Sequence, residues 1–156
     1  MARRVDFSVV EAAVWDAVDR FHARDRALVV LGASEWSMAH RLAVYFEQSF
    51  PNWNVDCEYN RQGGSEDSKT MDAESGKVRP DITIHRRGLL MPEDNLLVIE
   101  LKRDSSGIDL AKSRVSAFTS ASVDSRIFQY QYGLALVLGP KTTMSWFAEG
   151  RPLVQL

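Results

Sequence analysis

The stretch at residues 79–103, RPDITIHRRGLLMPEDNLLVIELKR, decides the fold that the sequence predicts. Residues 82–85 alternate between apolar and polar side chains, and residues 95–102 form a longer apolar run, so both segments have the length and pattern of a strand. Arg86-Arg87-Gly88 and Pro92, which lie between them, are typical of turns and loops. The stretch is therefore predicted to form a β-hairpin with a long connection.

Three charged side chains, Asp81, Glu100 and Lys102, lie within or beside these apolar runs. Side chains alternate between two faces along a strand, so Glu100 and Lys102 share one face while Ile99 lies on the other. Asp81 begins the preceding strand, on the face opposite Ile82. We therefore expect two carboxylates and one ammonium group to meet at the ends of two neighbouring strands.

A charged group that leaves water is costly unless it is paired or bound to a metal. Two adjacent carboxylates repel each other unless a cation lies between them, and hard oxygen ligands suit Mg²⁺, with Mn²⁺ as a substitute. Asp81 and Glu100 are therefore candidate metal ligands, and Lys102 could orient a water or stabilise an anion. An ordinary Glu–Lys pair at the exposed end of a strand, with Asp81 as a turn residue after Pro80, explains the same pattern.

Pro80-Asp81 followed by Glu100-Leu101-Lys102 resembles the motif of the PD-(D/E)XK nuclease superfamily, which has the restriction-endonuclease-like fold. The resemblance covers roughly residues 34–139. It implies an α/β fold with an αβββαβ core, in which helices flank a mixed central sheet. Residues 1–33 would add an N-terminal helical extension to this core, and residues 140–156 would add a C-terminal strand and tail.

The same resemblance implies Mg²⁺-dependent hydrolysis of phosphodiester bonds in nucleic acid, with DNA as the expected substrate. Asp81, Glu100 and Glu35 would be catalytic residues and metal ligands, and the Leu101 carbonyl would be a further ligand. Lys102 would be catalytic by positioning or helping to deprotonate the attacking water.

Glu35 enters this set through the helix predicted to begin after Ser34, a typical N-cap residue. One helical step back from Met38, on the apolar stripe of that helix, places Glu35 on the side that faces the core. In the nuclease superfamily a glutamate of the first core helix commonly joins the metal site, and Glu35 is the matching position. A glutamate in a first turn also interacts favourably with the helix dipole, so a purely structural role stays open.

The composition is that of one ordinary globular domain: 156 residues, 45% hydrophobic and 26% charged. The net charge of −2 offers no overall basic signal for nucleic acid, although a local basic rim could still contact phosphates. The segment at residues 62–77 is rich in Gly, Ser and charged residues and is predicted to be a loop, either over the site or a tolerated insertion. Five basic residues are candidate phosphate contacts: Arg61, Lys77, Arg79, Lys112 and Arg114.

The sequence begins with basic residues but has no apolar secretory segment, and no apolar run reaches membrane-spanning length. These features predict a cytoplasmic protein without a membrane partner. The single Cys57 cannot form an internal disulfide and is expected in the core of a strand at residues 53–60. A homodimer is possible, because a double-strand break requires two active sites. The alternative to a nuclease is a catalytically inactive module of the same fold that binds nucleic acid or a protein, or an unrelated α/β scaffold.

Overall fold

The computed structural model describes residues 3–59, 71–73, 76–89, 91–121 and 129–154. Their centre is a mixed sheet in which β5 and β6 are parallel and every other neighbouring pair is antiparallel. Its six strands, in spatial order, are β1 (Asn54–Cys57), β4 (Ile82–His85), β5 (Asn95–Lys102), β6 (Tyr132–Leu138), β7 (Thr142–Ala148) and β8 (Arg151–Pro152).

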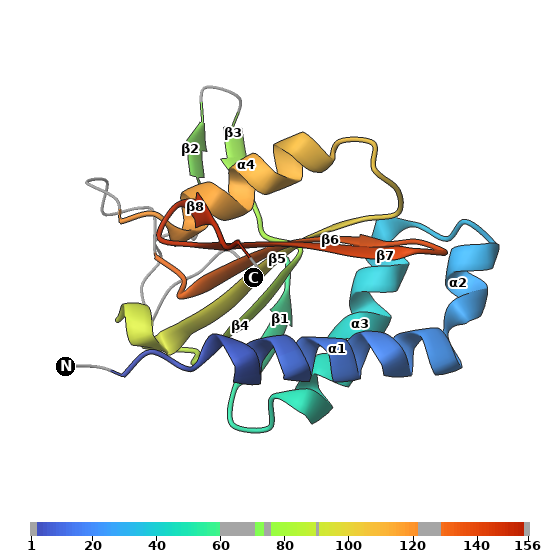
Figure 1. Ribbon diagram of the computed structural model, residues 1–156, viewed down its shortest axis with the longest axis horizontal. Helices are drawn as coiled ribbons and strands as arrows, with labels where there is room; N and C mark the ends of the chain where they lie inside the picture. Colours follow the sequence, from blue (N-terminus) through green and yellow to red (C-terminus); the bar gives the residue numbers. More distant parts are fainter. Residues whose placement is uncertain (1–2, 60–70, 74–75, 90, 122–128, 155–156) are drawn as a thin grey trace.

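Helices cover both faces of this sheet (Figure 1). Helix α4 (Ile108–Thr119) packs on one face, and α1 (Phe7–Arg24) and α3 (Glu35–Ser49) pack on the other. The short α2 (Arg26–Val30) joins α1 to α3. The predicted α/β class is confirmed. Among the sheet strands and the helices that cover them, α3, β1, β4, β5, α4 and β6 follow one another along the chain, and β7 and β8 complete the sheet.

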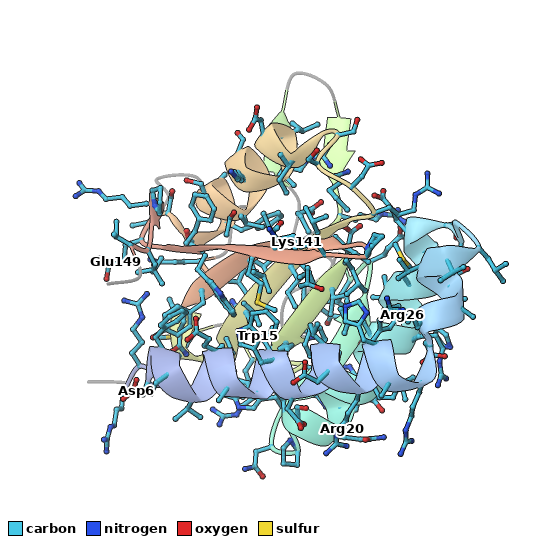
Figure 2. The ribbon with its side chains drawn as sticks, turned by 45° about the vertical axis from the view of Figure 1, so that its right-hand side comes forward. Asp6, Trp15, Arg20, Arg26, Lys141 and Glu149 are labelled. Atoms are coloured by element: carbon cyan, nitrogen blue, oxygen red, sulfur yellow. The ribbon has the colours of Figure 1, made fainter. Side chains whose placement is uncertain are left out.

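Helix α1 forms where its sequence pattern places it. Asp6 caps it by accepting a hydrogen bond from the Ser8 backbone N–H at 3.0 Å. Figure 2 shows Asp6 at one end of this helix and Arg26, in α2, beyond the other end. The predicted apolar stripe is fully buried against the sheet and α3, and consists of Val10, Val14, Ala17, Val18 and Phe21.

The hairpin predicted within residues 79–103 is confirmed as β4 and β5, which pair antiparallel. Gly88 lies in the turn with a φ of +83°, a conformation that glycine adopts without steric cost. The 3₁₀ helix η1 (Pro92–Asp94) completes the connection. The two sheet faces are also distinct: Ile99 packs in the core beneath α1 and α3, whereas Val98 packs beneath α4.

Three local predictions were wrong. The segment predicted as a loop at residues 62–77 contains a separate hairpin of β2 (Met71–Ala73) and β3 (Gly76–Val78). The strand predicted at residues 53–60 is shortened to β1, because Glu58 adopts a positive φ of 50° and ends it. Cys57 is exposed rather than buried. Within the described residues, no helix is both long and apolar enough to span a membrane.

Gly133, near the start of β6, lets α4 approach the sheet closely. A Cβ atom at this position would lie 2.9 Å from the Val115 carbonyl oxygen and 3.0 Å from the Val115 Cβ. The first of these atoms belongs to helix backbone and cannot move by changing a rotamer. The close approach matters for the site because α4 carries Arg114 over β5.

Replacing Gly133 with Ala should therefore destabilise the protein by about 1–3 kcal/mol, the usual cost of overpacking. Urea denaturation measures this loss. The exposed Ser113 on the same helix is the matched control, since Ser113→Ala should change the unfolding free energy by less than about 0.5 kcal/mol. Equal unfolding midpoints for Gly133→Ala and the parent would contradict the packing described here.

Candidate metal site and the adjoining cleft

Asp81 and Glu100 lie on neighbouring strands. Ile82, the first residue of β4, pairs with Ile99, so Asp81, which precedes Ile82, lies beside Glu100 along the backbone. The Asp81 carboxylate accepts a hydrogen bond from the Leu101 backbone N–H at 2.7 Å, which fixes its orientation at the edge of β5. Asp81 and Glu100, which the sequence predicts to meet at the strand ends, are therefore neighbours along the backbone of the sheet.

Glu100 is a buried acid with an incomplete set of partners. The residue is 2% exposed, and within the described part of the chain its Oε1 atom has no hydrogen-bond partner. Its Oε2 atom lies 3.7 Å from a guanidinium nitrogen of Arg114. Burial, reinforced by the charge of Asp81, raises the pKa of Glu100 to about 8, although Arg114 and Lys102 act in the opposite direction.

The ionised form of Asp81 is also disfavoured by its surroundings. Burial raises its pKa, and the charges of Glu35 and Glu58 add to the increase, while the hydrogen bond from Leu101 and the charge of Lys102 lower it. The carboxyls of Glu35, Glu58, Asp81 and Glu100 therefore interact electrostatically where α3, β5 and the ends of β1 and β4 meet. A cation bound there would favour the ionised form of both carboxylates.

Lys102 and Glu35 form the exposed side of this site. The Lys102 ammonium nitrogen lies 3.9 Å from Glu35 Oε1, and Glu35 Oε2 accepts a hydrogen bond from the Arg103 backbone N–H at 3.1 Å. Ser34 caps α3 through the Ser37 N–H, as predicted, and so directs the first turn of the helix toward the end of β5. Of the four residues predicted to be catalytic, Glu35 and Lys102 therefore form a direct contact, and Asp81 and Glu100 lie beside each other along the sheet backbone.

The residues that fit a divalent cation best are the two strand carboxylates. Asp81 and Glu100 supply hard oxygen atoms, and the unpartnered Oε1 of Glu100 has an open acceptor position. Glu35 is engaged instead by Lys102 and Arg103. In the described segments, no three His, Cys, Asp or Glu side chains are grouped in a way that could hold a metal ion.

Of the five basic residues predicted to contact phosphates, the three whose side chains the structure describes, Arg79, Lys112 and Arg114, are dispersed. Arg114 faces Glu100, whereas Lys112 lines a separate groove beside β7 and β8. Arg79 is exposed just before β4. Lys77 belongs to β3, but its side chain lies outside the described part of the chain, as does the whole of Arg61.

A cleft of about 590 Å³ adjoins the carboxylates and was not anticipated from the sequence. Asp81 and Glu58 line one side of it, and α3 contributes the other side through Trp36 and His40. Trp36 is 69% exposed, and its indole N–H donates a hydrogen bond to the Glu58 carboxylate. The available sequence signal was a tryptophan next to Glu35 that lies off the apolar stripe of its helix.

Cys57 also lines this cleft. Partial burial, together with the charges of neighbouring acids such as Asp56 and Asp81, raises the pKa of its thiol to about 11. The thiolate is therefore scarce at neutral pH, which disfavours Cys57 as a nucleophile.

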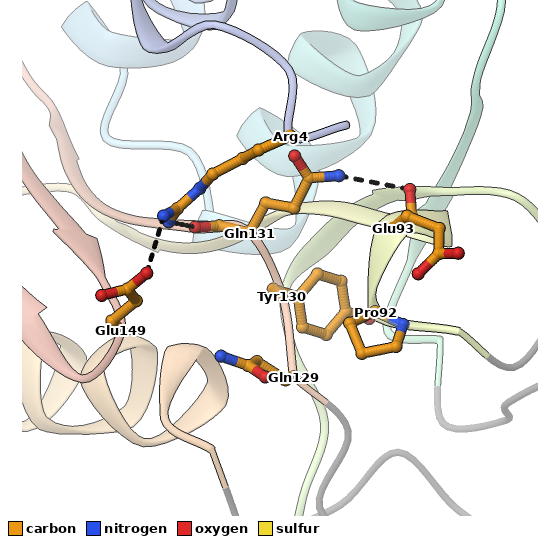
Figure 3. A pocket seen from close by; sticks show the side chains of 7 residues that line it. All are labelled: Arg4, Pro92, Glu93, Gln129, Tyr130, Gln131 and Glu149. Atoms are coloured by element: carbon orange, nitrogen blue, oxygen red, sulfur yellow. Dashed lines mark hydrogen bonds and ion pairs between the residues drawn. The ribbon is translucent and has the colours of Figure 1, made fainter. Parts of the chain in front are cut away.

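A smaller cavity of about 210 Å³ lies at the opposite end of β5 and β6 (Figure 3). Gln129, Tyr130 and Gln131 are among the residues that line it. Figure 3 shows Arg4 between Gln131 and Glu149, and the Gln131 amide donates to the Glu93 carbonyl at 3.2 Å. These residues therefore lie away from Asp81 and Glu100.

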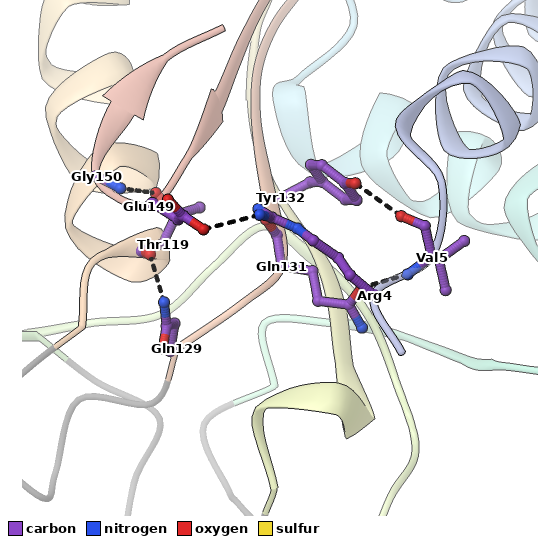
Figure 4. A network of polar contacts seen from close by, with 8 residues as sticks. All are labelled: Arg4, Val5, Thr119, Gln129, Gln131, Tyr132, Glu149 and Gly150. Carbon is purple, nitrogen blue, oxygen red and sulfur yellow. Dashed lines mark hydrogen bonds and ion pairs between the residues drawn. The ribbon is translucent and has the colours of Figure 1, made fainter. Parts of the chain in front are cut away.

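The contacts around this cavity are structural (Figure 4). The Gln131 side chain accepts a hydrogen bond from the Val5 N–H at 2.8 Å, and the Tyr132 hydroxyl donates to the Val5 carbonyl at 2.7 Å. Arg4 forms an ion pair with Glu149 at 3.0 Å. This network fastens the segment before α1 to the start of β6.

The chain matches no protein-family model, no curated protein and no solved structure. The site is therefore interpreted from its own residues and their arrangement: two buried strand carboxylates, a lysine paired with a helix glutamate, and an adjoining cleft.

Proposed function

We propose that this protein is a Mg²⁺-dependent nuclease of the PD-(D/E)XK type, acting on DNA. The observation that carries the proposal is Glu100: a buried carboxylate with one unpartnered oxygen, set beside Asp81 and two residues before Lys102. Arg114 offsets only part of the cost of burying this carboxyl, because the pKa of Glu100 is still raised, so its presence favours a function that uses it. The element order α3, β1, β4, β5, α4, β6 supports the restriction-endonuclease-like fold.

In this proposal Asp81 and Glu100 hold the metal ion, with the Leu101 carbonyl as a further oxygen ligand and Glu35 as a direct or water-mediated one. When bound, Mg²⁺ would lower the pKa of a bound water and neutralise charge on the phosphate. The Leu101 N–H holds the Asp81 carboxylate in place at 2.7 Å. Glu35 orients the Lys102 ammonium group, which positions the attacking water and stabilises the developing negative charge.

Plasmid cleavage by the purified protein tests the proposal. Supercoiled DNA should be nicked or degraded with Mg²⁺ and remain intact with EDTA, and Glu100→Gln should abolish the activity. Glu47→Gln is the matched control, because Glu47 is exposed on α3 and should be dispensable. If Glu100→Gln cleaves as well as the parent, the activity belongs to a contaminant and the proposal fails.

A second candidate function is a non-catalytic module that binds nucleic acid or a protein. It is favoured by the Arg114 guanidinium, which lies 3.7 Å from Glu100 and partly neutralises it without a metal, and by the net charge of −2. Calorimetric titration with Mn²⁺ separates the two functions. A site tighter than about 1 mM supports the nuclease, because a carboxylate site of this type acts only with a bound cation. The absence of such a site supports the module.

A further inference from the structure

We propose that the cleft between α3 and the end of β1 receives one unpaired nucleobase of the strand being cut, stacked against Trp36. This inference rests on the proposed nuclease function and assigns its substrate class, which is single-stranded or frayed DNA. The cleft volume of about 590 Å³ lies within the range of about 300–1,000 Å³ that is typical of small-molecule sites.

The position of Trp36 suits a stacking surface. Trp36 follows Glu35 directly in α3, and 69% of the residue is exposed, so its indole contributes little to the core. The hydrogen bond from its N–H to the Glu58 carboxylate holds the ring in one orientation. A fixed, exposed indole offers a flat face to a base without losing much conformational entropy on binding.

The charges around the cleft favour a neutral base over a phosphate. Glu58 and Asp81 line the same wall, and both would repel a phosphate group placed there. Arg41, the guanidinium on the opposite wall, is already paired with Asp25 at 3.1 Å. Apolar surface from Leu28 and Ala39 completes a lining that a nucleobase can contact through its faces.

The connection to the metal site follows from covalent geometry. A nucleobase is joined through one sugar to its phosphate, and Asp81 belongs both to the cleft wall and to the proposed metal site. A phosphate bound at Asp81 and Glu100 would therefore bring its own base to the mouth of the cleft. In an intact duplex that base is paired and stacked, so the strand must be single or frayed for the cleft to be filled.

The net charge of −2 and the dispersed basic residues also favour a single strand over a duplex as the substrate. Binding to a duplex depends mainly on contacts between cations and phosphates, and among the described residues Arg79, Lys112 and Arg114 do not form one basic surface. Base stacking does not require a basic surface, and an aromatic side chain contributes substantially for each base bound.

Binding measured without turnover tests the inference. A short fluorescein-labelled oligothymidylate and a hairpin duplex of equal length are each titrated with protein in Ca²⁺ in place of Mg²⁺. Trp36→Ala should weaken oligothymidylate binding about tenfold or more and change duplex binding about twofold or less, while Trp36→Phe should restore most of the affinity. Trp15→Ala is the matched control, because Trp15 is a 41% exposed tryptophan on α1 outside the cleft.

Several outcomes would overturn the inference. The first is that Trp36→Ala and Trp15→Ala bind oligothymidylate with affinities within twofold of each other. The second is that Trp36→Ala loses affinity equally for oligothymidylate and for the duplex. The third is that the parent protein does not bind oligothymidylate. A dimer in sedimentation that Trp36→Ala dissociates would show that a second copy fills the cleft, and would also overturn it. Mg²⁺-dependent cleavage lost in Glu100→Gln but unaffected by Trp36→Ala would retain the nuclease and remove only the base cleft.

Discussion

Replacing Lys102 with Ala should lower the rate of DNA cleavage by about 10²- to 10³-fold while leaving divalent-ion affinity nearly unchanged. Lys102 is not among the proposed metal ligands, and its ammonium group lies 3.9 Å from Glu35, at the exposed side of the site. Its removal takes away a positive charge beside the phosphate without removing an oxygen ligand. Single-turnover cleavage measures the rate, and Mn²⁺ calorimetry measures the affinity.

Lys141→Ala is the matched control for this prediction. Lys141 is an exposed lysine in the turn between β6 and β7, and its loss should affect neither quantity (Figure 2). A parallel loss of cleavage and metal affinity in Lys102→Ala would mean that Lys102 organises the carboxylates rather than acting on the substrate. An unchanged cleavage rate would remove Lys102 from the catalytic residues altogether.

The stability of the metal-free protein should fall as the pH rises from about 5 to 8, and Glu100→Gln should remove most of this dependence. The carboxyl of Glu100 ionises near pH 4.5 in an unfolded chain and near pH 8 in the folded protein. Between these values the folded state holds a proton that the unfolded state has released. Raising the pH across this window therefore favours unfolding, and the effect is complete once the pH exceeds the folded pKa.

Comparing two pH values isolates the contribution of Glu100. The stability difference between Glu100→Gln and the parent should shift by about 2–4 kcal/mol in favour of the variant from pH 5 to pH 8, without metal. Urea denaturation at both values measures this shift, and changes in packing caused by the amide cancel in the comparison. Glu47→Gln, an exposed α3 variant, should give no such shift.

A bound divalent cation should restore the stability that the parent protein loses at pH 8. A divalent cation stabilises the ionised form of Glu100, so Mg²⁺ or Mn²⁺ should raise the melting temperature of the parent at pH 8 and leave Glu100→Gln nearly unaffected. Identical pH profiles for the parent and Glu100→Gln would contradict the burial and unpartnered state assigned to this carboxyl.

The positions of Asp81 and Glu100 could be predicted because they depend only on strand parity and a hairpin. Two-residue periodicity defines which side chains share a face, and the antiparallel pairing of β4 and β5 brings the two carboxylates together. Helical periodicity in the same way directed Glu35 toward the end of β5. These regularities are local, so the amino-acid sequence carries them directly.

The contacts that depend on how elements pack could not be predicted. Arg114 lies off the apolar stripe of α4, and its approach to Glu100 follows from the rotation of that helix over β5. The cleft beside Trp36 exists because β1 ends early at Glu58, a positive-φ residue that alternation alone would have continued as strand. The strands of the β2–β3 hairpin are only three residues long, which is too short for a periodic pattern to distinguish them from a loop.

The central claim is that acidic groups from two strands share a divalent cation. Anomalous diffraction from a crystal soaked in Mn²⁺ tests it most directly. The account predicts a peak between the carboxylates of Asp81 and Glu100, with the Arg114 guanidinium displaced from its position 3.7 Å from Glu100. A crystal soaked at saturating Mn²⁺ with no peak there, and with Arg114 still beside Glu100, would contradict it.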